Sequence, residues 1–150
     1  MSEHVATVRW HRQTPDFKYE TYNRAHDWIF PEKDVTVPAS AAPAYKGEPT
    51  RVDPEEAFVA SLSSCHMLTF LALAARKRFV VDRYEDEAVG VMAKNGEGRF
   101  WVSEVTLRPK VAFSGDKMPS AADLEELHHG AHEQCFIANS VKTEIRVEPR

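Results

Sequence analysis

Two thiols are the residues of this chain best suited to covalent chemistry. Cys65 and Cys135 lie 70 positions apart, and the chain contains 2 cysteines in all. A reducing cytosol disfavours a permanent structural disulfide between them. Two cysteines cannot build an all-cysteine zinc site, although histidines could complete a mixed one. Three uses therefore stay open: two inert buried thiols, a metal site, or a redox pair.

Cys65 lies in the middle of the strongest helix signal in the sequence, which runs from Pro54 to about Lys77. Asp53 can act as the N-cap, Pro54 fits the first helical position, and Glu56 stands where a capping box has its acid. Apolar side chains cover nearly the whole circumference, which predicts a buried helix. The polar residues that interrupt it cluster around Cys65: Ser61, Ser63, Ser64, His66 and Thr69. Free cysteine is itself often a small buried hydrophobe, so an inert Cys65 is the simplest alternative.

A reactive thiolate at Cys65 needs a positioned cation, and an acid could hold that cation in place. Cys65 lies 12 residues beyond Asp53, whereas the helix-dipole effect fades within the first turn. At about 100° per residue, Glu55 lies about 80° from Cys65 around the axis, and Glu56 lies about 180° away. Glu55 is therefore the acid free to face the thiol side, although both acids also simply favour a helix start.

The cation itself is the least determined part of such a site. Four arginines are candidates, each of which could equally be a solvated surface residue: Arg9, Arg12, Arg24 and Arg51. Arg24 is distinctive because aromatic residues surround it in the sequence. Those aromatics, at positions 22, 28 and 30, could equally belong to the core.

The second cysteine closes a second expected helix, which opens at Pro119 and Ser120 in a looser capping-box pattern. His128 and His132 are four positions apart and share a face that leads towards Cys135. A zinc site from these three residues is one hypothesis, and surface histidines are the commoner explanation. If Cys135 instead meets Cys65, their Cα atoms must come within about 7 Å, so the second helix must pack on the first.

The remaining pattern predicts one α+β domain spanning residues 1–150. Strands are expected at 5–11, 17–22, 26–30, 79–84, 88–93, 100–113 and 141–147, with a hairpin turn at 95–98. Residues 31–54 are proline-rich and flanked by core-like segments, which favours a long ordered loop over a linker.

Composition narrows the function classes. The chain has 150 residues, of which 43% are hydrophobic and 28% charged, which is typical of a globular protein. Its formal net charge of −4 leaves no basic footprint for nucleic acid. The longest apolar run, Met67 to Ala75, falls far short of the roughly 20 residues that span a bilayer. The first residues lack the features of a signal peptide, so we expect a cytoplasmic protein without membrane partners.

Two segments carry a resemblance to a known family. Residues 53–67, DPEEAFVASLSSCHM, have Pro-Glu at a helix start, then small residues, then a cysteine ten positions after Glu55. Residues 131–140, AHEQCFIANS, contain the second cysteine with Asn-Ser a few residues on. In this order and spacing, they resemble the OsmC/Ohr family of thiol peroxidases, the osmotically inducible and organic hydroperoxide resistance proteins.

The resemblance implies a fold and a set of roles. The fold would be OsmC-like, with antiparallel sheets wrapped around a long buried central helix in an intertwined homodimer. Cys65 looks like the peroxidatic cysteine, Cys135 like the resolving one, and Glu55 like the acid that positions the catalytic arginine. Arg24 is the family arginine carried over to this chain, although the surrounding Tyr-Asn-Arg-Ala-His matches the family poorly. Phe136-Ile137 also replaces the Pro-Tyr common in the Ohr branch, which suggests a different branch.

The resemblance further implies an activity: reduction of organic hydroperoxides, with hydrogen peroxide as a secondary substrate, in oxidative-stress defence. A dithiol of lipoyl or other type would serve as reductant, and the chemistry needs no metal or organic cofactor. The alternative is a non-catalytic dimeric OsmC-like protein that senses redox state or binds a ligand.

Overall fold

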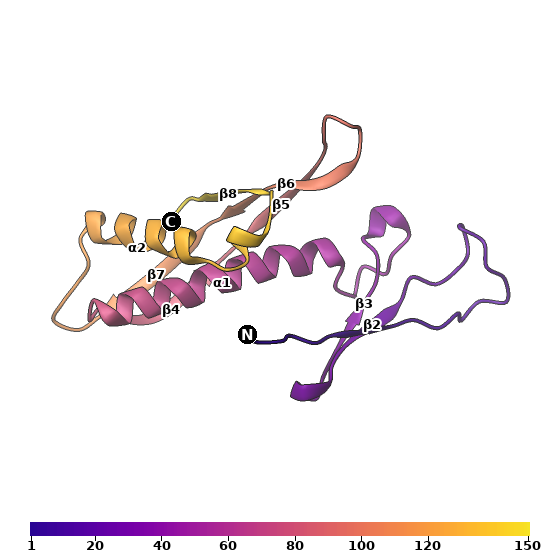
Figure 1. Cartoon of the computed structure of the whole chain (residues 1–150), viewed down its shortest axis with the longest axis horizontal. Helices are drawn as coiled ribbons and strands as arrows, with labels where there is room; N and C mark the ends of the chain where they lie inside the picture. The colour runs from indigo at the N-terminus through magenta and orange to yellow at the C-terminus, as the bar shows by residue number, and fades with distance from the viewer. The chain divides into compact units, whose positions relative to one another are not determined.

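Short strands and two α-helices make up the secondary structure of this computed structural model, which describes residues 1–150 (Figure 1). The chain divides into two units, residues 1–57 and residues 58–150. Helix α1 (Pro54–Arg76) begins in the first unit and continues through the second.

The first unit contains a three-stranded antiparallel sheet in the order β1-β2-β3. Its strands are β1 (Thr7–Arg9), β2 (His26–Phe30) and β3 (Val35–Ala39). Short 3-10 helices occupy Pro31–Lys33 and Pro43–Tyr45. In the register, Trp28 lies opposite both Val8 and Val37. The expected strands at 5–11 and 26–30 are therefore confirmed, the first in shorter form.

The expected strand at 17–22 is wrong. This segment folds into a turn in which the amides of Thr21 and Tyr22 both donate to the carbonyl oxygen of Lys18, at 3.0 Å each. Local hydrogen bonds of this kind satisfy the backbone without a partner strand.

The expected loop at 31–54 is only partly correct, because it contains strand β3. Pro38 lies opposite Asp27 within that strand. Proline cannot donate a ladder hydrogen bond and is found on edge strands, and β3 is at the edge of its sheet. The carbonyl oxygen of Pro38 accepts from the amide of Val52 at 3.2 Å, which ties the following loop back to the sheet.

The second unit continues α1 and adds five strands and a second helix. The strands are β4 (Val80–Asp86), β5 (Val89–Lys94), β6 (Phe100–Leu107), β7 (Pro109–Ser114) and β8 (Glu144–Val147). The second helix is α2 (Ala121–Gln134), and a 3-10 helix covers Ala138–Ser140. Ser120 and Asp123 form the expected capping box at the start of α2. These elements confirm a mixed α+β fold with a long helix.

The strands of this unit form two sheets. β4 pairs with β7 antiparallel, while β5, β6 and β8 form the other sheet. The expected hairpin at 95–98 is confirmed, since β5 and β6 pair antiparallel and Asn95 Oδ1 accepts from the amides of Glu97 and Arg99 at 3.0 Å each. The single strand expected at 100–113 is wrong: it divides at Arg108 into β6 and β7, which belong to different sheets. β8 joins β6 in parallel.

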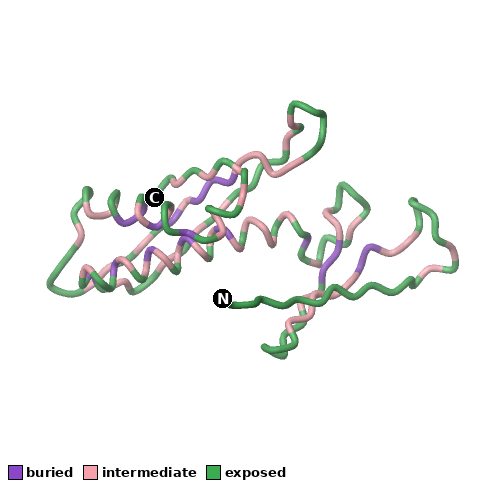
Figure 2. Tube along the Cα trace, in the orientation of Figure 1, coloured by how far each residue is buried: buried purple, intermediate pink, exposed green.

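Helix α1 begins as the sequence predicts. The amide of Glu56 donates to Asp53 Oδ1 at 2.8 Å, and Glu56 Oε2 accepts from the amide of Asp53 at 3.1 Å. Burial of the whole circumference is not observed within one chain. The buried side chains form a single stripe at intervals of four: Leu62, His66, Phe70 and Ala74 (Figure 2). By length and composition alone α1 could cross a membrane, a criterion that apolar core helices also meet.

The buried stripe of α1 faces two apolar clusters. Towards its C-terminal end, Phe70 and Ala74 pack with Leu127 and Ala131, which places α2 alongside α1. Nearer its N-terminal end, Leu62 packs with Val105 and Leu107 of β6, and side chains of β8 complete this cluster. The helix–helix packing required for the two cysteines to meet is therefore present.

Candidate functional site

The second unit brings the two cysteines together. Both are free thiols, with Cys65 half-buried in the middle of α1 and Cys135 buried at the C-terminal cap of α2. The amide of Ala138 donates to Cys135 Sγ at 3.4 Å. Burial, and then the adjacent Cys65 side chain, raise the pKa of the Cys135 thiol to about 11. At neutral pH Cys135 is therefore a protonated thiol next to Cys65.

A cavity of about 550 Å³ opens over Cys65, and this volume is within the range of small-molecule sites. Leu68 and Phe136 supply apolar surface at its rim and are 61% and 82% exposed. Arg76 is the one cation among the lining residues. The others are Ser61, Ser64, Cys65, Thr69, Ala72, Leu73 and Gln134. Arg76 was not among the arginines considered from the sequence, because it lies outside the polar cluster in the middle of α1.

Arg24 lies in the first unit, where its guanidinium makes local contacts. Its Nη1 and Nη2 donate to the carbonyl oxygens of Tyr22 and Tyr19. The guanidinium carbon stands 3.6 Å from the centroid of the Tyr22 ring and 5.1 Å from that of Tyr19. Arg24 is 9% exposed and lines a 340 Å³ cavity with Trp10 and Phe17. Of the three aromatic residues noted around Arg24 in the sequence, only Tyr22 contacts the guanidinium, and Tyr19 is the second ring that does so.

Glu55 lies in the first turn of α1 and is half-buried. No ion pair joins it to Arg24, so the acid–arginine pair implied by the family resemblance is not formed in this structure. Glu56 serves the capping box, as expected. Of the two glutamates, Glu55 is therefore the one whose carboxylate is free.

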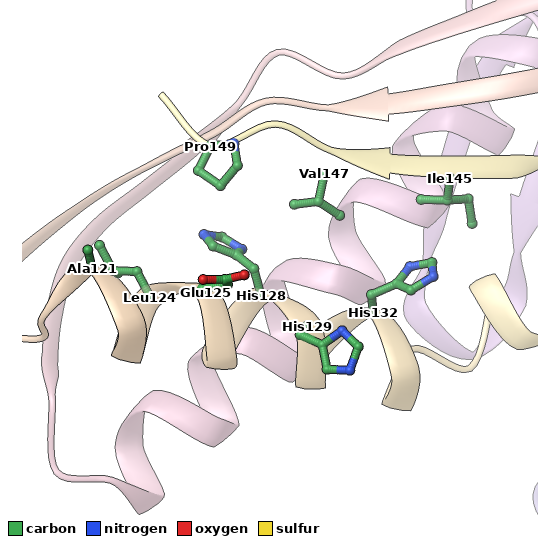
Figure 3. A pocket seen from close by; sticks show the side chains of 9 residues that line it. All are labelled: Ala121, Leu124, Glu125, His128, His129, His132, Ile145, Val147 and Pro149. Atoms are coloured by element: carbon green, nitrogen blue, oxygen red, sulfur yellow. The ribbon is translucent and has the colours of Figure 1, made fainter.

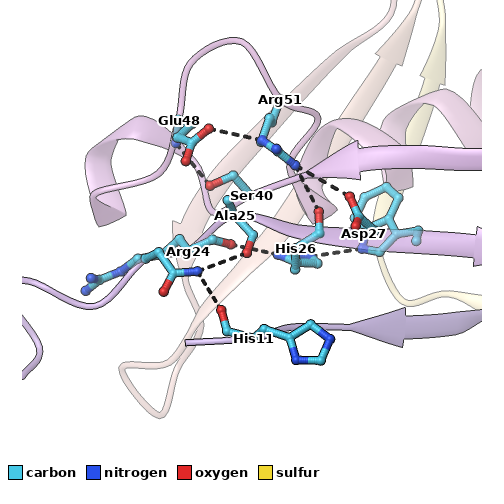
Figure 4. Close-up of polar contacts among 10 residues, drawn as sticks. His11, Arg24, Ala25, His26, Asp27, Ser40, Glu48 and Arg51 are labelled. Atoms are coloured by element: carbon cyan, nitrogen blue, oxygen red, sulfur yellow. Dashed lines mark hydrogen bonds and ion pairs between the residues drawn. The ribbon is translucent and has the colours of Figure 1, made fainter. Parts of the chain in front are cut away.

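Two of the other arginines considered from the sequence also have local partners. Arg51 pairs with Glu48 at 3.0 Å and Asp27 at 3.6 Å, and its Nη1 donates to the carbonyl oxygen of His26 at 3.2 Å (Figure 4). Arg12 donates to two carbonyl oxygens of its own loop, at 2.6 and 2.7 Å. Arg51 thus joins the loop that contains it to strand β2 within the first unit.

A buried histidine pair, which was not predicted from the sequence, begins at His66, the residue after Cys65. His66 Nε2 and His128 Nδ1 are 3.2 Å apart in a hydrogen bond, and the two rings stack at an interplanar angle of 8°. Burial lowers the pKa of each to about 4, and for His66 the neighbouring His128 and His132 add to that effect. Both imidazoles are therefore neutral at physiological pH.

The hypothesis of a zinc site at His128, His132 and Cys135 is not supported by the geometry. No group of three or more histidine, cysteine or acidic side chains is placed to hold a metal ion. Cys135 is directed to the Ala138 amide and to Cys65, while His128 is bonded to His66.

A comparison with protein families identifies the relatives of this arrangement. The model of the OsmC-like protein family matches residues 47–150, which include both cysteines and Glu55. This chain belongs to the OsmC-like protein family. No curated protein sequence matches it at a significant level.

Solved structures of OsmC-like proteins share the fold. An OsmC-like protein of unknown function from Vibrio cholerae is 49% identical over 100% of both chains, with a TM-score of 0.96. An organic hydroperoxide resistance protein, OhrB, of Bacillus subtilis is 19% identical, covers 99% of this chain and 98% of its own, and has a TM-score of 0.71. One from Elizabethkingia anophelis is 15% identical, with coverage of 99% and 94% and a TM-score of 0.73. These likenesses show that this chain has the OsmC-like fold over its whole length.

Proposed function

We propose that this OsmC-like chain is a thiol-dependent peroxidase that reduces organic hydroperoxides, with hydrogen peroxide as a secondary substrate of the same thiol. The observation that carries the proposal is the meeting of Cys65 and Cys135 from positions 70 residues apart, beneath a 550 Å³ cavity. Family membership supports the same reaction class.

The reaction balances with two thiols and an external dithiol. The Cys65 thiolate attacks the terminal oxygen of the hydroperoxide, and the O–O bond breaks. The alkoxide that leaves takes up a proton and becomes an alcohol. Cys65 is then a sulfenic acid. The Cys135 thiol attacks the Cys65 sulfur, a disulfide forms, and the sulfenic hydroxyl leaves as water with the Cys135 proton. A dithiol reductant reopens the disulfide by exchange and is itself oxidised to a disulfide.

The environment of each sulfur supports this order of steps. Because the pKa of Cys135 is raised to about 11, that residue holds its proton at neutral pH and is a poor first nucleophile. Cys65 lines the cavity, so a hydroperoxide can reach its sulfur, whereas Cys135 is buried with 1% of its surface exposed. Apolar Leu68 and Phe136 at the rim favour an organic hydroperoxide over hydrogen peroxide.

The activating cation in this proposal is Arg24, held over the sulfur by Glu55. Arginine suits the task because its planar guanidinium can bind a carboxylate through two parallel hydrogen bonds. Arg24 must first leave the carbonyl oxygens of Tyr19 and Tyr22. Arg76, which already lines the Cys65 cavity, is the second candidate. Substituting each arginine with lysine and measuring the rate of peroxide consumption distinguishes the two.

We further propose that the protein works as a homodimer in the cytoplasm, with a small-molecule or protein dithiol as its reductant and without a metal or organic cofactor. Exposed apolar side chains support a second copy as partner. Val89, Val91 and Met92 of β5 are between 40% and 47% exposed, and Leu68 of α1 is 61% exposed. The three residues of β5 lie close together on one strand, and exposed apolar patches of this kind mark protein interfaces.

Intact-mass thiol counting after treatment with one equivalent of cumene hydroperoxide tests the peroxidase proposal. The expected product loses both free thiols and 2 hydrogen masses, about 2 Da, as an intramolecular disulfide. Cys65→Ser should leave the Cys135 thiol intact, whereas Cys135→Ser should trap Cys65 as a sulfenic acid. Two unreacted thiols in the unaltered protein would refute the proposal.

A non-catalytic redox sensor or ligand-binding protein is the second candidate. The occupied guanidinium of Arg24 favours it, because an arginine tied to backbone carbonyls does not activate a thiol. Such a sensor forms the disulfide once and turns over slowly. Sustained hydroperoxide consumption with excess dihydrolipoamide would exclude it.

A further inference from the structure

The two sulfur atoms of the second unit form a pair of soft metal ligands. Cys65 lines the 550 Å³ cavity, so a small ion can reach its sulfur. Cys135 is 1% exposed, and its thiol is in hydrogen-bonding contact with that of Cys65. One sulfur is therefore open to an ion from solution, and the other lies beside it in the protein interior. Thiolates prefer soft cations to hard ones.

Histidine does not complete this pair to a larger metal site. No group of three or more histidine, cysteine or acidic side chains is placed to hold an ion. His128 and His132 line a separate cavity of 510 Å³ between α2 and β8 (Figure 3), and none of its lining residues lines the Cys65 cavity. His66 is adjacent to Cys65 in the sequence, but it bonds to His128 from the buried stripe of α1. An ion held by both thiols therefore has these two sulfur atoms as its protein ligands.

A site with two thiolate ligands favours one kind of ion. Structural Zn²⁺ sites are tetrahedral, and Mg²⁺ and Ca²⁺ require a shell of oxygen ligands, so none of these three ions is satisfied here. Cu(I) is a soft ion that forms stable linear complexes with two thiolates. Such a complex has a single negative charge. Arg76 is the one charged residue that lines the Cys65 cavity, and no acidic residue does, so the surroundings favour that charge.

We propose that the reduced thiols of Cys65 and Cys135 bind one Cu(I) ion between their sulfur atoms. As each Cu–S bond forms, the thiol releases its proton to solvent, and the oxidation states of copper and sulfur do not change. Because one pair of sulfur atoms serves both uses, a chain with bound Cu(I) cannot form the Cys65–Cys135 disulfide, and a chain with that disulfide cannot bind Cu(I). The copper site does not depend on the peroxidase proposal, since it requires the contact between the thiols and no reaction with a peroxide.

Anaerobic competition with bathocuproine disulfonate, a chelator that becomes coloured when it binds Cu(I), measures this binding in the reduced full-length protein. We expect one Cu(I) per chain. Because the Cys135 thiol has a pKa of about 11 and must lose its proton, the affinity should be at least about tenfold higher at pH 8 than at pH 7. Equal affinities at the two pH values would mean that Cys135 is not a ligand and would overturn the proposal.

The disulfide form of the unaltered protein, prepared with diamide, is a control that needs no substitution, and it should bind no Cu(I). Cys65→Ser and Cys135→Ser each keep one sulfur, and loss of the second ligand should weaken binding by at least about a hundredfold. His132→Gln should leave the affinity unchanged, because this histidine lines the other cavity.

Three results would overturn the copper site: undiminished binding in the disulfide form, undiminished binding in either serine variant, or weaker binding in a folded His132→Gln protein. The peroxidase proposal fails separately. A protein that binds Cu(I) but keeps both thiols after treatment with cumene hydroperoxide would contradict the peroxidase proposal alone.

Discussion

Acid should destabilise this OsmC-like chain well above the pH at which carboxylates titrate, because of the buried pair His66 and His128. Their pKa is about 4 in the folded state against an ordinary 6.5. Between these values the unfolded chain binds more protons than the folded chain, so stability is complete above the unfolded pKa and falls as pH decreases. At about 1.36 kcal/mol per pKa unit, each histidine contributes at most about 3 kcal/mol. By pH 5 about 2 kcal/mol of this is lost for each, or about 4 kcal/mol for the pair.

Urea unfolding at pH 8, 7, 6 and 5, followed by the helical circular dichroism signal, measures this loss directly. His128→Gln keeps a polar amide opposite His66 but cannot titrate, so the decrease between pH 8 and pH 5 should shrink by about half. His129→Gln is the matched control, because His129 is the exposed neighbour and should leave the decrease intact. Equal unfolding free energies at pH 8 and pH 5, or an unchanged decrease in His128→Gln, would refute the reasoning.

Three further predictions concern stability. The pKa of the Cys135 thiol is about 11 in the folded chain, against an ordinary 9.0, so the unfolded chain loses its proton first as pH rises. The free energy of unfolding in urea should therefore fall by about 2 kcal/mol between pH 8.5 and pH 10.5, and Cys135→Ala should remove that decrease. Asp53→Ala removes the capping hydrogen bond of α1 and should cost about 1 kcal/mol, while Asp53→Ser should retain most of it. In Gly90→Ala the new Cβ would stand 2.5 Å from Cγ2 of Val59, so thermal unfolding should show a loss of about 1–3 kcal/mol that Val59→Ala partly restores.

Local signals explain why much of the fold could be predicted from the sequence. The capping boxes at Asp53 and Ser120 require only neighbouring residues, and both helices begin where these patterns place them. The Asn95 turn is likewise local, and β5 and β6 pair on either side of it. Alternation identified β8, whose residues are in turn exposed and half-buried over Glu144–Val147.

Non-local pairing explains the errors. Strand β3 contains Pro38, which reads as a breaker, and only the place of this strand at a sheet edge makes it acceptable. Segment 17–22 has a strand-like composition, but the Lys18 carbonyl closes it into a turn. β6 and β7 form one continuous pattern in the sequence, and their separation depends on different partner strands.

The candidate site shows the same division between local and non-local information. The cysteines could be identified by type and by motif, and their meeting required the packing of α2 on α1, which the structure supplies through Phe70 and Leu127. The surroundings of Arg24 could not be predicted, because its guanidinium binds backbone carbonyl oxygens, which every residue type has in common. Its predicted role beside Glu55 stays a prediction.

Two neighbouring residues in the middle of α1 have different roles because successive side chains of a helix point in different directions. Cys65 and His66 are adjacent, yet about 100° of rotation directs one to the cavity and the other to the buried stripe. This division cannot be recognised in the sequence. Apolar residues occur on nearly every side of α1, so neither face has a sequence pattern of its own. The division has a physical consequence: the thiol can react at the cavity while the neutral His66–His128 pair keeps α2, and with it Cys135, fixed against α1. Loss of that pair should therefore weaken disulfide formation without altering the first attack of Cys65 on a hydroperoxide.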